Sequence, residues 1–240
     1  MNSLLVNAHQ VLRELQHIGD PSRAAHSGRF FKTGIGQYGE GDVFIGVTVP
    51  QLRQVAKRSL TLPLSEVKKL LTNSIHEVRL TALLTLVYQF KKADEVGQGE
   101  IYDFYLEHTH FVNNWDLVDS SAPYILGGYL ADRDRTILYQ LARSDNLWER
   151  RIAILATAWF IRAGESKDAF AISELLQEDD HDLIHKAVGW MLREVGKSCG
   201  QEVEEAFLKL HYKTMPRTML RYAIERFDEP LRQQYLKNRV

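Results

Sequence analysis

Cysteine is almost missing from this sequence, because Cys199 is the single cysteine among 240 residues. One thiol excludes an internal disulfide framework and a cysteine-rich zinc site. Long hydrophobic runs are missing as well, since no apolar stretch approaches the roughly 18 residues that a membrane-spanning helix needs. The first residues, MNSLLVNAHQVLREL, have neither a basic start nor a long apolar centre, so no signal peptide is expected. We therefore expect a cytoplasmic protein with no membrane partner.

A strong charge of either sign is also missing. The 30 Lys and Arg residues and 31 Asp and Glu residues give a net charge of −1, and 45% of the residues are hydrophobic. This balance is ordinary for a globular protein and argues against a chain coated in positive charge, although a local basic face is compatible with it. The length suits one large core, and we predict a single domain over residues 1–240.

The sequence does contain an internal repeat. Helix-like segments begin near His76, Asn113, Trp148 and Asp182, with a terminal one near Met215, and amphipathic helix partners lie between them. When Arg79, Trp115, Arg151 and Lys186 are taken as equivalent, their spacings are 36, 36 and 35 residues. That period fits two short helices and two turns, and such pairs bury their apolar faces by stacking. We predict an all-α fold, a HEAT-like repeat α-solenoid.

Residues 32–49, KTGIGQYGEGDVFIGVTV, break the helical pattern. They hold five glycines, and the run VFIGVTV is rich in β-branched and aromatic residues. The segment is expected to form a Gly-rich loop or a small β-hairpin. We favour a hairpin used in binding, because long loops in compact domains are usually functional; a long ordered connection is the alternative.

Aligning the repeats exposes polar residues at packing positions. The equivalent residues Arg79, Trp115, Arg151 and Lys186 form a first row along the repeats. One helical turn further along, Asp119 occupies a position where Leu83 and Leu155 are its equivalents, with Trp190 in the fourth repeat. A further turn along, Arg193 stands where other repeats have small or apolar residues. Departures of this kind are typical of functional positions. Asp119 as a helix cap, and the tryptophans as core residues, are the structural alternatives.

A face with cations, two indoles and one carboxylate suits nucleic acid. Lysine and arginine side chains would meet phosphates, and solvated surface charges are the alternative interpretation. The expected phosphate-binding residues from the rows are Arg79, Arg151, Lys186 and Arg193. Further basic candidates are Arg53, Lys57, Arg217 and Arg221.

The runs NNWDLVDSSAP, WERRIAIL and HKAVGWMLRE resemble the AlkD-like DNA alkylation repair family, whose members are HEAT-like repeat proteins and include DNA glycosylases. The likeness covers roughly residues 5 to 230, and the Gly-rich segment resembles the hairpin-bearing branch. The resemblance implies that Asp119, Trp115 and Trp190 surround the lesion nucleotide and that Arg151 and Arg193 hold the backbone. Phe30 matches an aromatic residue that lines the site, without the hydroxyl of a tyrosine.

The resemblance implies a DNA repair glycosylase that hydrolyses the N-glycosidic bond of cationic alkylated purines, of the 3-methyladenine or 7-methylguanine type. Such a base leaves without a general acid, so one carboxylate suffices, and no metal or organic cofactor is expected. The alternative is a non-catalytic module that binds branched or damaged DNA through a hairpin at residues 32–49. A HEAT scaffold for protein partners is a third possibility. The expected partner is double-stranded DNA, alkylated or branched, bound by a monomer that associates with the nucleoid.

Overall fold

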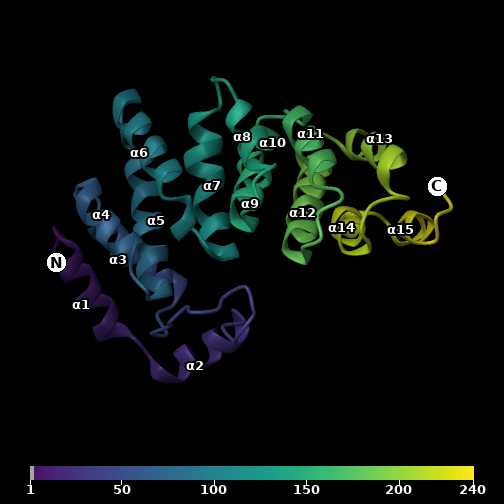
Figure 1. The fold of residues 1–240 in the computed structure, drawn as a ribbon. Coiled ribbons are helices and arrows are strands. Elements are labelled where there is room, and N and C mark those ends of the chain that lie inside the picture. The colour runs from purple at the N-terminus through teal and green to yellow at the C-terminus, as the bar shows by residue number, and fades with distance from the viewer. Residues whose placement is uncertain (1–2) are drawn as a thin grey trace. The chain divides into compact units, whose positions relative to one another are not determined.

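The structure is a computed structural model that describes residues 3–240. Over these residues every named element is a helix, and Figure 1 shows the order of the α-helices along the chain. Contacts between elements divide the chain into two compact units, Met1–Ser121 and Ala122–Val240. The prediction of an all-α helical-repeat fold is confirmed. The prediction of a single domain stays a prediction.

The first unit is built around α5 (His76–Phe90). This helix is buried on nearly all sides and contacts α1, α3, α4 and α6, as its apolar residues on more than one face predict. Leu83 and Leu86 are fully buried, and truncating either to Ala would cost about 2–5 kcal/mol of stability. The other elements are α1 (Ala8–Ile18), α2 (Pro21–Phe30), α3 (Val49–Arg58), α4 (Leu64–Leu71), α6 (Glu95–Glu107) and the 3-10 helix η1 (Thr109–Phe111).

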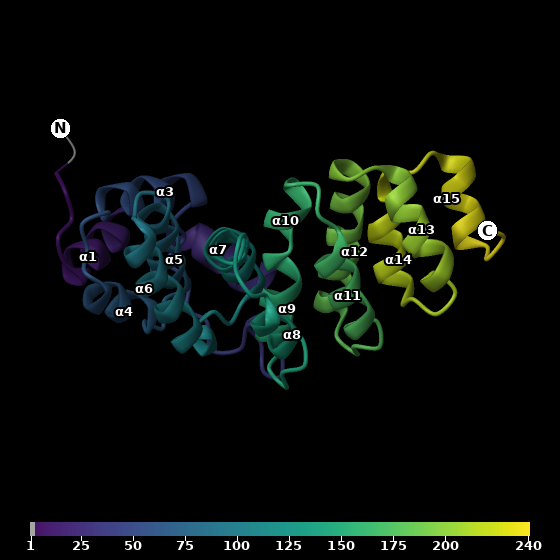
Figure 2. The same ribbon diagram turned by 90° about the horizontal axis from the view of Figure 1, so that it is seen from above.

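The second unit is built around α12 (Asp182–Ser198). Figure 2 shows α12 between α9 and α10 on one side and α13 and α14 on the other, and it contacts all four. Its buried residues recur at helical spacing, as in Ile184, Val188 and Leu192, so it presents one apolar stripe. The other elements are α8 (Thr136–Leu141), α9 (Leu147–Ala156), α10 (Ala158–Arg162), α11 (Lys167–Leu175), α13 (Gln201–His211), α14 (Arg217–Ala223), η2 (Ile224–Arg226) and α15 (Glu229–Leu236).

Helix α7 (Trp115–Tyr129) begins in the first unit and ends in the second. Helices α5, α7, α9, α12 and α14 start within two residues of the positions that the repeat predicts. One expected helix is interrupted: WERRIAILATAWFIR forms α9 and α10, which are separated by Thr157. The Thr157 hydroxyl donates to the carbonyl oxygen of Ile154 at 2.6 Å, a bond typical of bent helices.

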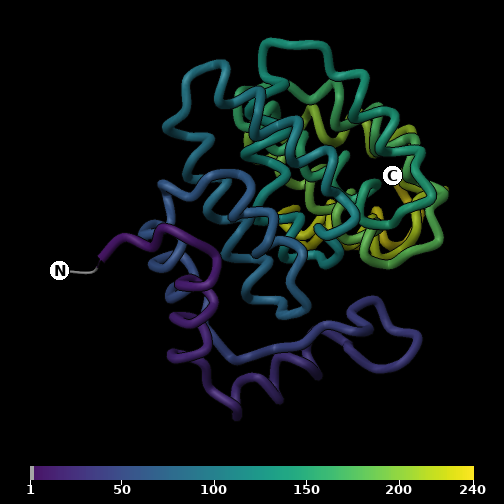
Figure 3. The backbone as a smooth tube through the Cα atoms, turned by 60° about the vertical axis from the view of Figure 1, so that its left-hand side comes forward, coloured from purple at the N-terminus to yellow at the C-terminus, as the bar shows by residue number. Residues whose placement is uncertain are grey.

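Residues 19–48, which we call the arm, connect α1 to α3 through α2 and the Gly-rich segment. In Figure 3 the arm leaves α1 and returns to α3. Helix α2 begins because Asp20 caps it, accepting from the backbone nitrogens of the next two non-proline residues, and because Pro21 suits its first position. The segment after α2 forms turns rather than strands.

The favoured prediction of a β-hairpin at residues 32–49 is wrong, and the alternative of an ordered loop is right. Within residues 3–240 the structure has only an isolated parallel bridge, between Val43 and Ile75. The backbone groups of the VFIG run bond to α5 instead of to a second strand: the His76 nitrogen donates to the Val43 carbonyl oxygen at 2.8 Å. The Glu77 carboxylate accepts from the nitrogens of Ile45 and Gly46 at 2.7–3.1 Å.

Candidate nucleic-acid interface

Trp115 and Asp119 lie at the start of α7, one turn apart on the same face. The helix begins there because the Asn114 side chain accepts from the Trp115 backbone nitrogen at 2.8 Å. Both side chains are half-buried. A tryptophan and a carboxylate on one partly exposed helical face can contact a ligand while remaining fixed by the helix.

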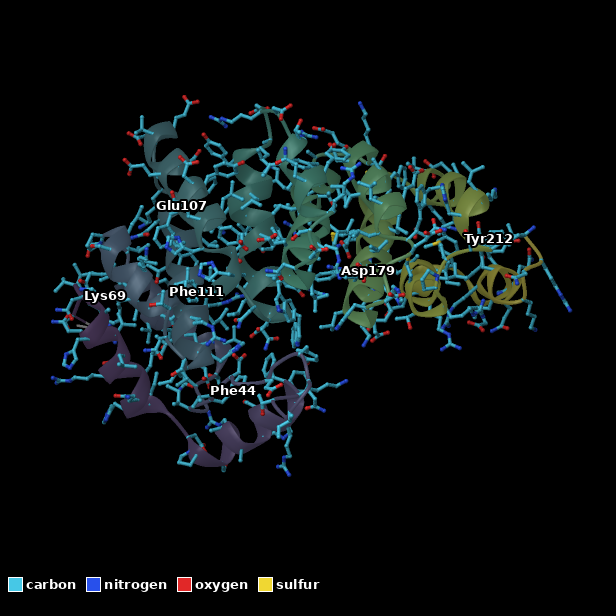
Figure 4. The ribbon with its side chains drawn as sticks, viewed as in Figure 1. Phe44, Lys69, Glu107, Phe111, Asp179 and Tyr212 are labelled. Atoms are coloured by element: carbon cyan, nitrogen blue, oxygen red, sulfur yellow. The ribbon has the colours of Figure 1, made fainter. Side chains whose placement is uncertain are left out.

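Aromatic side chains from the arm pack against Trp115. The Phe31 ring stacks on the Trp115 ring with a centroid distance of 5.2 Å and an interplanar angle of 17°, and Phe30 meets the indole edge-on at 6.0 Å. Phe44, which Figure 4 labels on the Gly-rich segment, stacks on Phe31 at 5.0 Å. Phe30 is 57% exposed, so the structure brings this expected site residue to Trp115 and leaves part of its ring at the surface.

A buried group of charges lies behind these rings. His76 Nδ1 is 3.0 Å from an Asp42 oxygen, and His76 Nε2 is 2.8 Å from an Asp116 oxygen. Arg79 donates to the other Asp42 oxygen at 2.5 Å, and Asn114 donates to Asp42 at 3.1 Å. Asp42 therefore ties the arm to α5 through two ion pairs and to the residue before α7 through a hydrogen bond.

The two carboxylates keep His76 charged. Burial alone would lower the pKa of His76, but its hydrogen bonds to Asp116 and Asp42 outweigh burial and raise that pKa to about 9. Burial would raise the pKa of Asp42, but the hydrogen bond from His76 and the charge of Arg79 hold it below the usual range. At neutral pH the group therefore contains two cations and two anions, and both ring nitrogens of His76 donate.

The sequence alone did not indicate His76, Asp42, Phe31 or Phe44. The available signals were the aromatic pair at residues 30–31 and a histidine at the first position of a repeat helix. Asp116 lies in the first turn of α7, where a negative charge is favourable for the helix dipole, and it also forms an ion pair with His76.

Asp119 lies near a buried phenol. The Ser121 hydroxyl donates to the Leu117 carbonyl oxygen at 2.6 Å, so the Tyr105 hydroxyl, 2.9 Å away, donates to Ser121. Burial raises the pKa of Tyr105, and the charge of Asp119 raises it further. Tyr105 is thus a neutral support behind α7, with its proton directed to Ser121.

In the second unit, Lys186, Trp190 and Arg193 recur at spacings of four and three residues along α12 and are all partly exposed. Lys186 pairs with Asp182 at 2.7 Å, and Arg193 pairs with Glu225. The structure therefore places three expected site residues on one helical face. Gly189 lets α14 approach this helix, because a Cβ at Gly189 would lie 2.4 Å from a backbone oxygen of α14.

Arg79 does not belong to an exposed cationic row, which corrects the prediction. It is 4% exposed and donates to the carbonyl oxygens six and five residues earlier, at 3.0 and 3.2 Å. Arg150 makes the same two bonds at the same offsets, at 2.9 and 3.0 Å. Arg79 is therefore equivalent to Arg150, so Leu80 is the α5 residue equivalent to Arg151.

Arg151 is also buried, at 4% exposed, and it donates to the Leu183 carbonyl oxygen at 2.5 Å. The prediction that its charge is presented at the surface is wrong, because the guanidinium holds the first turn of α12. In the corrected alignment of the repeats, the equivalents of Asp119 are Leu84 and Leu155, which are 4% and 1% exposed. Asp119 is therefore still a charged residue at a position where the other repeats have buried leucines. Arg53, on α3, is exposed as expected.

Across residues 3–240, no helix is long and apolar enough to cross a membrane. The same part of the chain contains no group of three or more His, Cys, Asp or Glu residues that could hold a metal ion.

Comparison with known proteins agrees with the resemblance of the sequence. The family described as "DNA alkylation repair enzyme" matches residues 11–227. The chain is similar to a solved structure described as a predicted DNA alkylation repair enzyme from Enterococcus faecalis, with a TM-score of 0.68 and 18% identity over 88% of this chain and 97% of that chain. No curated protein matches. Since the family match spans both units and all the residues of α7, the chain belongs to the DNA alkylation repair enzyme family.

Proposed function

We propose that this member of the family is a DNA glycosylase that releases cationic alkylated purines of the 3-methyladenine or 7-methylguanine type. Family membership supports a role in DNA repair. The observation that carries the finer proposal is Asp119, a half-buried carboxylate one turn after Trp115, at a position where Leu84 and Leu155 are core residues. A carboxylate at a packing position costs stability unless it is paired or solvated, and such departures are typical of functional sites.

The reaction would use the charge of Asp119. As the bond between the sugar C1′ and the purine nitrogen breaks, the cationic base takes the bonding electron pair and leaves neutral. The sugar develops oxocarbenium character, which a nearby carboxylate stabilises. Water then bonds to C1′ and gives its proton to Asp119 or to bulk water, which leaves an abasic site. Trp115, backed by Phe31, would pack against the nucleotide and attract its positive charge through the indole face.

DNA contacts are proposed on both units. On α12, Lys186 and Arg193 would exchange their acidic partners for phosphates, because Asp182 and Glu225 are 57% and 59% exposed and can move into water. Trp190 lies between them in sequence and would contact the same strand. On the first unit, the exposed candidates include Arg53, Lys57 and Phe30.

The direct test is release of base from methylated DNA. Duplex DNA carrying radiolabelled N-methyl groups is incubated with the protein, and the released bases are separated by chromatography. Release of 3-methyladenine or 7-methylguanine above the spontaneous rate supports the glycosylase. A folded protein that binds the duplex and releases neither base would leave the non-catalytic module as the function.

Exposed residues of the arm favour a second candidate function, a non-catalytic module that binds branched DNA. Ile35 is 97% exposed, and Arg29 and Lys32 are exposed on the same arm. Apolar side chains that insert between bases, flanked by cations, are typical of proteins that bind bent or open DNA. If the arm reads branches, Ile35→Ser lowers affinity for a four-way junction several-fold and leaves duplex affinity unchanged. Equal loss on both DNAs would contradict that preference.

A further inference from the structure

A pocket in the first unit lies beneath the arm. Its volume is about 250 Å³, and residues of α2, the Gly-rich segment, α3, α5 and α7 line it. Pockets for drug-sized ligands span roughly 300–1,000 Å³, so this one suits a smaller molecule. It lies beside the partly exposed face of Trp115, because Phe31 both lines the pocket and stacks on the Trp115 ring.

The walls suit a flat ring. Phe31, Phe44 and His76 line the pocket, and their rings contact one another with centroid distances of 4.6–5.0 Å. Leu52 and Leu80 line the pocket as well and are buried. A lining that combines aromatic and aliphatic side chains favours a planar heterocycle over a sugar or a flexible chain.

Within residues 3–240, the pocket contains one carboxylate oxygen without a hydrogen-bond partner. The Asp116 carboxylate bonds through one oxygen to His76, while its other oxygen, Oδ1, is buried and has no hydrogen-bond partner among the described residues. Glu77 also lines the pocket, with both oxygens held by backbone nitrogens of the arm. An unpartnered carboxylate oxygen calls for an N–H donor and disfavours a phosphate or a carboxylate.

The pocket opens through side chains at the surface. Arg23 and His26 on α2 are exposed, Ser27 beside them is half-buried, and Val49 at the start of α3 is 45% exposed. A small molecule can therefore enter without moving the core residues Leu52 and Leu80.

We propose that this pocket binds one planar, amino-bearing heterocycle of purine size, whose exocyclic N–H donates to Asp116. The inference deepens the proposed function, because a glycosylase for alkylated purines releases such a ring next to the pocket. It identifies a holding site for the free base at the start of α7, which includes Asp116 and does not include Asp119.

Ligand-observed NMR titration of the full-length protein tests the pocket without any catalysis. Adenine and 3-methyladenine are the probes, and purine, which lacks the amino group, is the comparison. We expect both amino-bearing bases to bind one site with a Kd on the order of 0.1 mM, as a ligand of about ten non-hydrogen atoms allows. Purine binds at least several-fold more weakly, because it gives Asp116 no exocyclic donor.

Ser27→Phe fills the opening from a half-buried position on α2, so the core stays intact, and should weaken adenine binding at least tenfold. Ala25→Phe is the matched control on the same helix; Ala25 is exposed and does not line the pocket, so binding should equal wild type. No saturable binding to folded wild type, or binding that Ser27→Phe leaves unchanged, overturns the pocket. Base release from methylated DNA is scored separately: activity without binding refutes the pocket alone, and binding without activity refutes the glycosylase alone.

Discussion

At the scale of single residues, His76 links stability to pH. Its pKa is about 9 in the folded protein, against an ordinary value of 6.5, because Asp42 and Asp116 stabilise the charged ring. A raised folded-state pKa contributes stability that is fully present below about pH 6.5 and is lost as pH rises through 9. At about 1.4 kcal/mol per pKa unit, this shift sets an upper limit on the order of 3 kcal/mol for the contribution of the charged His76 to the free energy of unfolding.

The prediction compares wild type with His76→Gln, which cannot be charged. From pH 6.5 to 9 the free energy of unfolding of wild type should fall relative to that of the variant, as measured by urea denaturation. Lys and Tyr titrations common to both proteins cancel in the difference. A constant difference across this range would show that His76 is neutral in the folded protein.

The repeat gave the sequence its own internal comparison for single residues. Asp119 stands out from the buried leucines of the other repeats, and both Asp119 and Trp115 are partly exposed in the structure. The expectation failed for Arg79 because its partner, Asp42, lies 37 residues away on the arm and its carbonyl acceptors lie in a turn. A pattern of residue types does not distinguish an arginine that binds phosphate from one that binds a backbone turn.

At the scale of elements, the arm depends on glycine at one close approach. Gly46 has φ +80°, and a Cβ there would lie 2.0 Å from the Asp20 carbonyl oxygen. Gly36 has a similar φ of +75° and open space around its Cβ position, so it is a matched control. Alanine at either position would carry the backbone strain of a positive φ, about 1–2 kcal/mol. Only Gly46→Ala would also clash with the Asp20 carbonyl oxygen.

We therefore expect Gly46→Ala to destabilise the protein by more than Gly36→Ala and to release the arm from α5. Amide hydrogen exchange should show faster exchange at the nitrogens of Ile45 and His76 in the first variant only. Equal exchange and equal unfolding free energies in the two variants would mean that the close approach to Asp20 has no role in holding the arm.

The sequence predicted the repeat helices well and the arm poorly. The helices have strong periodicity and clear starting residues, such as Asn114 before α7. The VFIG run has strand-like composition, yet its hydrogen bonds go to α5, including the Glu77 carboxylate. Composition indicates extended backbone and does not reveal whether the partner is a strand or a helix end.

At the scale of the whole molecule, a net charge of −1 means that DNA affinity depends on local cations. Lys186→Ala and Arg193→Ala should each weaken binding to any duplex sequence and reduce the salt slope by about one per lost phosphate contact. Arg151→Ala is the control, because its guanidinium is buried: it should lower thermal stability and leave the slope unchanged. Fluorescence anisotropy of labelled duplex over a range of salt concentrations measures all three. If only Arg151→Ala changed the salt slope, Arg151 would contact phosphate and Lys186 and Arg193 would not.

If the charge of Asp119 drives base release, removing that charge should slow release without unfolding the protein. Single-turnover release of 3-methyladenine from methylated duplex DNA is compared for wild type and Asp119→Asn, with folding and duplex affinity checked in both. Asn keeps the size and polarity of the side chain and removes the charge. The account predicts that wild type releases the base, and that the folded variant binds DNA equally well but loses on the order of 10²-fold or more in rate. A folded Asp119→Asn protein with a near wild-type rate would contradict it.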